Sequence, residues 1–234
     1  MRYIYLLIIL TCFSCSNERV LHLPEIEQAE VTEVLDVSPA YIFYDETQAD
    51  STLLNRKNLI ISTNWLVNVD KRLTLKQAIP HIKFMQDKKR NAEMHKNEDA
   101  KNYFTCNDTS IGNLGFLEFT DVFYEFSEPI DTSINLQDLV AEKLKNNQTS
   151  TSTFLEIPLD ITNNNKDKIQ QELQSYIELL ALSTSISEDM VIKGYAIDLY
   201  FDERMSFQDY ISVKSKLSKI KSEKIIITNN EFIY

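Results

Sequence analysis

An internal repeat constrains the fold of this 234-residue chain more than any other feature of its sequence. Val69–Leu75 (VDKRLTL) matches Phe201–Phe207 (FDERMSF) position by position, at an offset of 132 residues. Upstream of both segments, apolar residues alternate in the same register, as they do on one face of a β-strand. These residues are Leu59, Trp65, Val67 and Val69 in the first copy, and Val191, Ile197, Leu199 and Phe201 in the second. The shared motif and register predict two structurally related units.

Each motif also predicts the start of a helix. Thr74 is followed by Gln77 and Ser206 by Asp209, the spacing at which an N-cap side chain and a residue three positions on satisfy free backbone amides. Apolar residues then recur at helical spacing. They are Leu75, Ile79, Ile82 and Met85 in the first helix, and Phe207, Ile211, Leu217 and Ile220 in the second.

Other segments complete the same order of elements in both halves. Short strands are expected near 34–39 and 155–158 before the motif, and near 118–121 and 226–229 after the helix. A helix is expected from Asn165 in the second half, with a shorter counterpart at Thr47–Lys57 in the first. Each half therefore has the order β-α-β-α-β. This order predicts an α/β (α+β) fold of two tandem repeats, with mixed sheets and helices on one face.

The polar segments divide the chain into parts. Residues 145–153 (KNNQTSTST) are polar and lack an apolar anchor, so they predict a linker between the halves. The expected parts are a signal at 1–14, a tether at 15–30, a first repeat at 31–144 with a polar insertion at 88–113, the linker, and a second repeat at 154–234.

The N-terminus resembles a bacterial lipoprotein signal. Arg2 precedes the apolar run Tyr3–Phe13, which is shorter than the roughly 20 residues needed to span a bilayer. The resemblance implies a lipid on Cys15, with Cys12 as the competing site and an ordinary secretory signal as the alternative. A lipoprotein would lie in the cell envelope, on the periplasmic or outer-membrane side, held by acyl chains such as palmitate. Cys106 would then be the only free cysteine, so no structural disulfide is expected.

Charge and composition exclude several classes of function. The chain has 24 basic and 35 acidic residues and a net charge of −11, which argues against nucleic-acid binding. Anionic lipids would repel such a body, so we expect the lipid to hold it to the membrane. With 3 glycines, neither common glycine-rich phosphate loop can form. Signatures of common hydrolases, zincins and thiol-redox proteins are absent too, so we expect no cofactor.

The second half, about 155–228, resembles the periplasmic domain of the ExbD/TolR family. The resemblance lies in a strand that runs into an aspartate (AIDLYFD, 196–202), a helix start (SFQDY, 206–210) and a final strand (IIIT, 225–228). Members of that family carry a transmembrane helix with a protonatable aspartate, whereas residues 3–13 contain no acid. The resemblance therefore implies an envelope domain that pairs with itself as a homodimer or recognises a protein partner, without proton-driven work.

Two repeated charged pairs are the main candidate site residues. Asp70 with Arg72, and Asp202 with Arg204, follow a strand and precede a helix. They are candidate binding residues, although an acid in such a turn typically accepts backbone amides and so has a structural role. The alternative function is a hydrolase of envelope polymers in which Asp70 and Asp202 work as a carboxylate pair, about 5–10 Å apart.

The insertion 88–113 supplies two more candidate binding residues, His95 and Tyr103. His95 has acids nearby in the sequence, but their spacing matches no tight ligand pattern, so we expect no metal site. Taken together, the sequence predicts a non-catalytic, lipid-anchored binding or scaffold module of the cell envelope, and leaves enzymatic activity open.

Overall fold

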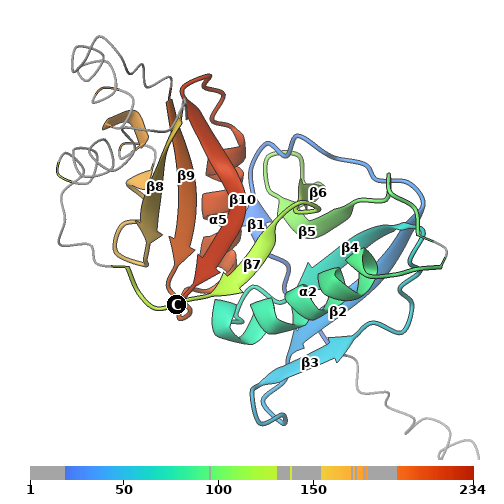
Figure 1. The fold of residues 1–234 in the computed structure, drawn as a ribbon. Coiled ribbons are helices and arrows are strands. Elements are labelled where there is room, and N and C mark those ends of the chain that lie inside the picture. The colour runs from blue at the N-terminus through green and yellow to red at the C-terminus, as the bar shows by residue number, and fades with distance from the viewer. Residues whose placement is uncertain are drawn as a thin grey trace, which may run out of the picture.

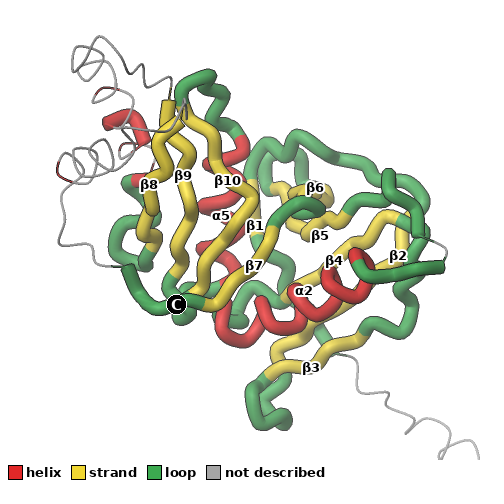
Figure 2. Tube along the Cα trace, in the orientation of Figure 1, coloured by secondary structure: helices red, strands yellow, loops and turns green. Residues whose placement is uncertain are grey.

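The computed structural model describes residues 19–94, 96–130, 138, 154–169, 171, 173–175, 178 and 194–234. These residues form a mixed α/β fold whose ten strands belong to two sheets (Figures 1 and 2). Cys12, Cys15, His95 and the predicted linker 145–153 lie outside the described residues.

The first sheet has the strand order β1-β5-β4-β2-β3, and β6 pairs with β5. Its strands are β1 (Glu25–Ile26), β2 (Val37–Tyr44), β3 (Thr52–Asn55), β4 (Asn64–Val69), β5 (Asn102–Asp108) and β6 (Asn113–Glu118). The second sheet has the order β7-β10-β9-β8. Its strands are β7 (Phe123–Phe126), β8 (Phe154–Ile161), β9 (Gly194–Phe201) and β10 (Ile225–Ile233). Each sheet thus contains four adjacent parallel strands, β1-β5-β4-β2 in one and β7-β10-β9-β8 in the other. The first sheet is mixed, as expected, because β3 and β6 are antiparallel to their neighbours, but the second sheet is entirely parallel.

The two predicted helix starts are confirmed. Helix α2 (Leu75–Arg90) begins after Thr74, whose backbone amide donates to the Gln77 side chain at 2.9 Å. Helix α5 (Phe207–Ser218) begins after Ser206, whose hydroxyl accepts the amide of Asp209 at 3.1 Å. In both places the side chains satisfy backbone groups that the first helical turn leaves free.

The helix predicted at Thr47–Lys57 is wrong, because this segment contains β3, which pairs antiparallel with β2. Two aspartates turn the chain before the strand. Asp45 accepts the backbone amide of Thr47, and Asp50 accepts that of Thr52. Ser51, which follows Asp50, has a φ of 57°, in the left-handed region that a helix does not use. The first half therefore has a strand where the β-α-β-α-β order requires a helix.

Segment 88–113, expected to be a polar loop, also needs correction. It includes the last turn of α2 and the strand β5, which pairs parallel with β4 inside the first sheet. Phe104 and Cys106 of this strand are fully buried. The expected strand at 118–121 is instead the end of β6 and the turn after it. Apolar side chains at alternate positions of β5 place it in the core, although polar residues surround it in the sequence.

The residues predicted to be a tether are bound to both halves of the molecule. We call His22–Glu30 the strap. In the strap, the amide of Glu25 donates to Gln208 of α5 at 2.8 Å, and the Gln208 side chain donates back to the Glu25 carbonyl at 2.9 Å. The amide of Ala29 donates to Asp108 of β5 at 2.7 Å. Because these bonds join distant parts of the chain, no local pattern of the sequence signals them.

The two halves meet where the repeated motifs face each other. We call residues 71–76 and 203–208 the crossing. The amide of Leu75 donates to the Met205 carbonyl at 2.9 Å, and the amide of Phe207 donates to the Leu73 carbonyl at 2.7 Å. Phe207 and Met205 lie 132 positions after Leu75 and Leu73, so the two bonds are reciprocal, as at a two-fold axis.

A second reciprocal pair of bonds extends the crossing. The amide of Lys76 donates to the Glu203 carbonyl at 2.9 Å, and that of Gln208 to the Lys71 carbonyl at 3.2 Å. Next to the crossing, the ring of Phe104 from β5 packs edge-on against Phe207 from α5, with 5.3 Å between centroids. Buried apolar residues of both halves accordingly form one continuous core.

Candidate functional site

The first repeated pair, Asp70 and Arg72, is a closed ion pair. Arg72 donates its backbone amide and its side-chain Nε to one carboxylate oxygen of Asp70, and Nη2 to the other at 2.8 Å. The amide of His22 from the strap adds a bond at 3.3 Å. Burial acts to raise the pKa of Asp70, but the hydrogen bonds and charge of Arg72 outweigh it and the pKa is lowered.

The second pair, Asp202 and Arg204, repeats this geometry. The Arg204 amide and Nε each lie 2.9 Å from one oxygen, and Nη2 lies 2.7 Å from the other. The side-chain hydrogen bond from Arg204 is the main reason that the pKa of Asp202 is lowered. A general acid must carry a proton at the working pH, and a nucleophile needs an accessible oxygen. These contacts therefore fit a structural role for both aspartates.

Tyr103 lies in β5, between Leu66 of β4 and Glu118 of β6. It is buried, and burial followed by the charge of Glu118 raises its pKa. The structure thus places Tyr103 within the first sheet, opposite Leu66, which lies four residues before Asp70. His95 lies outside the described residues.

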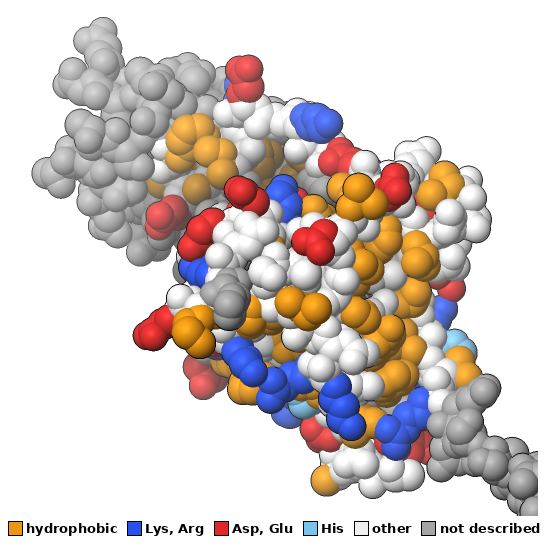
Figure 3. All heavy atoms as spheres, turned by 90° about the vertical axis from the view of Figure 1, so that its right-hand side faces the viewer, with side chains coloured by type: hydrophobic (Ala, Val, Ile, Leu, Met, Phe, Trp, Pro, Cys, Tyr) orange, Lys and Arg blue, Asp and Glu red, His pale blue; other side chains and the backbone are white. Residues whose placement is uncertain are grey.

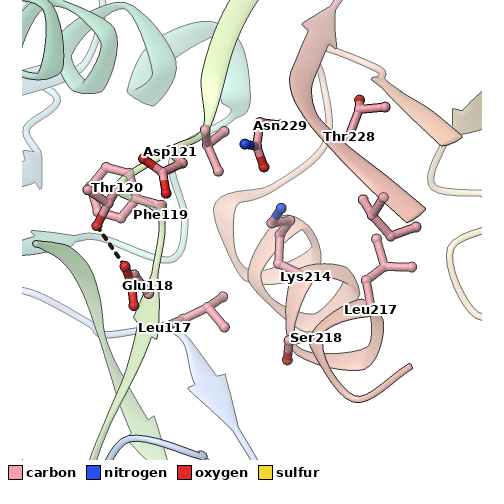
Figure 4. A pocket seen from close by; sticks show the side chains of 12 residues that line it. Leu117, Glu118, Phe119, Thr120, Asp121, Lys214, Leu217, Ser218, Thr228 and Asn229 are labelled. Carbon is pink, nitrogen blue, oxygen red and sulfur yellow. Dashed lines mark hydrogen bonds between the residues drawn. The ribbon is translucent and has the colours of Figure 1, made fainter. Parts of the chain in front are cut away.

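A cavity between the two halves is a candidate site because residues from both halves line it. It has a volume of about 290 Å³, and its walls come from the turn after β6, from α5 and from β10. Figure 4 shows Lys214 rising from α5 toward Asn229, while Thr120 and Asp121 form the opposite wall. The polar lining residues are Glu118, Thr120, Asp121, Lys214, Ser218, Thr228 and Asn229.

A buried polar cluster lies beside this cavity. Glu231 of β10 has no exposed surface, and its carboxylate accepts from Lys214 and, at 2.7 Å, from the Tyr210 hydroxyl. Tyr210 is in turn 3.0 Å from the hydroxyl of Tyr124 in β7. Burial, and then the charge of Glu231, raises the pKa of both tyrosines. Both stay neutral hydrogen-bonding groups at any physiological pH.

The cavity offers recognition chemistry more than reaction chemistry. Its lysine is paired with Glu231, so the ammonium is not a free nucleophile. The Thr120 hydroxyl donates to Glu118 at 3.0 Å. The remaining polar groups that line the cavity are hydroxyls, an amide and carboxylates. In the described part of the chain, no group of three or more metal-ligating side chains is gathered.

The sequence interpretation did not find Lys214 and Glu231. An acid at an inward-facing position of a strand was the available signal, because such a charge is buried only with a partner. No family model, curated protein or solved structure matches this chain. Among the described residues, no helix has the length and apolar character to cross a bilayer.

Proposed function

We propose that this chain is a non-catalytic binding or scaffold module of the bacterial cell envelope, anchored by a lipid on Cys15. Its two halves derive from one repeated unit, with the second closer to an ExbD/TolR-like domain, and the cavity between them receives an envelope partner. The reciprocal bonds of the crossing support the shared origin of the halves. The closed pairs at Asp70 and Asp202 support a role without acid–base catalysis.

The observation that carries this proposal is the attachment of the strap to both halves. Through Glu25 the strap bonds to α5, and through Ala29 it bonds to β5. His22 lies seven residues after Cys15, so a lipid there holds the crossing and both sheets through a short connection. An anchor built this way fixes the position of the whole body rather than that of one half.

Metabolic labelling with a palmitate analogue tests the anchor. The full chain is expressed in a bacterium with lipoprotein processing, beside the variants Cys15→Ser and Cys12→Ser. We expect the unmodified chain and Cys12→Ser to carry the label and to sediment with membranes. Cys15→Ser should lose both the label and the membrane association.

Three results would contradict this proposal. If Cys15→Ser keeps the label, or if Cys12→Ser alone loses it, the anchor is not on Cys15. If the unmodified chain takes up no label while it is exported, the segment is an ordinary secretory signal. Circular dichroism of each variant checks that the body is folded in every case.

A further inference from the structure

A basic depression lies where the described chain begins. Its volume is about 490 Å³, and its lining is Arg19, Leu53, Leu54, Asn55, Arg56 and Lys57. Three of these residues are cations and none is an acid, although acids outnumber cations in the chain by 35 to 24. Figure 3 shows Lys and Arg side chains gathered along the lower part of the molecule on this side.

Two of the three cations in the depression are available to an anion. The third, Arg19, is already paired with Asp45, 3.3 Å away, whose side chain is 10% exposed. In the described residues, neither Arg56 nor Lys57 belongs to an ion pair within 4.0 Å. The guanidinium of Arg56 instead lies over the ring of Phe84, 4.8 Å from its centroid. These two side chains keep hydrogen-bond donors for a ligand.

The depression is also close to the proposed anchor. Cys15 precedes Arg19 by four residues, and an extended chain spans at most about 14 Å over that distance. A lipid on Cys15 therefore keeps the depression near the headgroups of the same bilayer. Val20, which is 66% exposed, adds an apolar side chain at this point.

We propose that the edge of the first sheet formed by β2 and β3 rests on the membrane, where Arg56 and Lys57 bind the phosphate groups of anionic lipids. This inference rests on the proposed lipid at Cys15. Guanidinium groups bind phosphate oxygens with two parallel hydrogen bonds, and each Lys or Arg near an anionic surface adds about 1 kcal/mol. The acidic body as a whole is repelled, so these cations turn one particular end of it toward the lipid.

Spin labels on the lipidated full chain test the orientation. Cys106 is fully buried and burial raises its pKa to about 12, so an introduced cysteine is the reactive one. Asn58→Cys carries a label beside the depression. Ser222→Cys carries one in the turn between α5 and β10, at the opposite end of the molecule (Figure 1). Power saturation with oxygen and a nickel complex reads the depth of each label in the bilayer.

In vesicles that contain phosphatidylglycerol, we expect the label at position 58 at headgroup depth and the label at 222 in water. Two removed cations should shift the ratio of docked to undocked molecules about 30-fold. The double variant Arg56→Gln/Lys57→Gln should therefore release the label at 58. The control variant Lys221→Gln/Lys224→Gln also removes two positive charges, but at the other end of the molecule, and should leave the label at position 58 at headgroup depth.

The outcomes separate this inference from the proposed function. If the protein carries the lipid but both labels stay in water, or if the two double variants act alike, the docking surface is wrong and the anchor stands. Equal docking on phosphatidylcholine vesicles would also overturn it, because the attraction then does not depend on anionic lipids. If no lipid is attached, the palmitate experiment reports that failure separately.

Discussion

Asp70 and Asp202 occupy equivalent turns and accept the same three bonds from the arginine two positions later. They differ in one contact. In the described residues, Asp70 also accepts the backbone amide of His22 from the strap, and Asp202 has no such bond. The Asp70 side chain is fully buried, whereas that of Asp202 is 9% exposed. At this scale one of two equivalent residues makes an additional contact, which holds the strap against the crossing.

The first prediction compares Asp70→Asn with Asp202→Asn. An amide cannot accept all the bonds of a buried carboxylate, so Asp70→Asn should lower the free energy of unfolding by about 1.5–3 kcal/mol. Asp202→Asn should cost less, because Arg204 is 81% exposed and can be solvated instead. Urea unfolding of both variants measures the difference. A loss at Asp202 equal to or above that at Asp70 would mean that the His22 bond adds no stability.

The second prediction concerns acid stability and Asp108. The Ser110 hydroxyl and then the Ala29 amide lower the pKa of Asp108 to about 2. In the unfolded chain this aspartate has an ordinary pKa of about 3.9. The ionised Asp108 carboxylate therefore stabilises the folded protein fully at a pH above that value, and this contribution is lost as the pH falls toward 2. Urea unfolding between pH 6 and pH 2.5 should show a steeper decline for the unmodified chain than for Asp108→Asn. Parallel curves would show that the strap does not depend on this carboxylate.

At the scale of elements, local patterns predicted the parts that local physics controls. The alternation of apolar residues before each motif predicted β4 and β9, and the capping residues Thr74 and Ser206 predicted the starts of α2 and α5. Strand β3 was missed because paired aspartates and a left-handed serine, not apolar spacing, shape Thr47–Lys57. Strand β5 was missed because its neighbours in sequence are polar, while its parallel partners β1 and β4 are distant in the sequence.

The candidate site was harder to predict than the elements. The positions of Asp70 and Asp202 followed from the repeat, and their closed pairing with arginine agreed with the structural interpretation of such turns. The cavity between the halves could not be predicted, because its walls come from segments about a hundred residues apart. Glu231 meets Lys214 and Tyr210 only once α5 has packed on β10.

The third prediction isolates the backbone bonds of the crossing. Lys76 lies in the first turn of α2, where proline is tolerated because the helix does not use its amide. Lys76→Pro removes the bond to the Glu203 carbonyl, while Lys76→Ala keeps it; both remove the ion pair with the Glu203 side chain. We expect Lys76→Pro to be about 1 kcal/mol less stable than Lys76→Ala in urea unfolding. Equal stability would mean that the crossing contributes nothing through this bond.

At the scale of the whole molecule, three features join the halves into one body. These are the reciprocal bonds of the crossing, the strap across both sheets and the shared apolar core. We expect a body joined in this way to unfold as one unit, because each half would lose part of its core when the other opens. That the two halves form one cooperative body is the central claim of this account, because only then would the proposed lipid on Cys15 orient the cavity at the interface.

Native-state hydrogen exchange tests this claim most directly. Among the described residues, the amides of Leu75 and Phe207 bond across the crossing alone, to Met205 and Leu73. If the halves form one cooperative body, these two amides should open with the same free energy as the amides of β4 and β9. That free energy should also equal the global value from urea unfolding. If β9 and α5 open well below β4 and α2, and the crossing amides exchange like a loop, the halves are independent and the claim is contradicted.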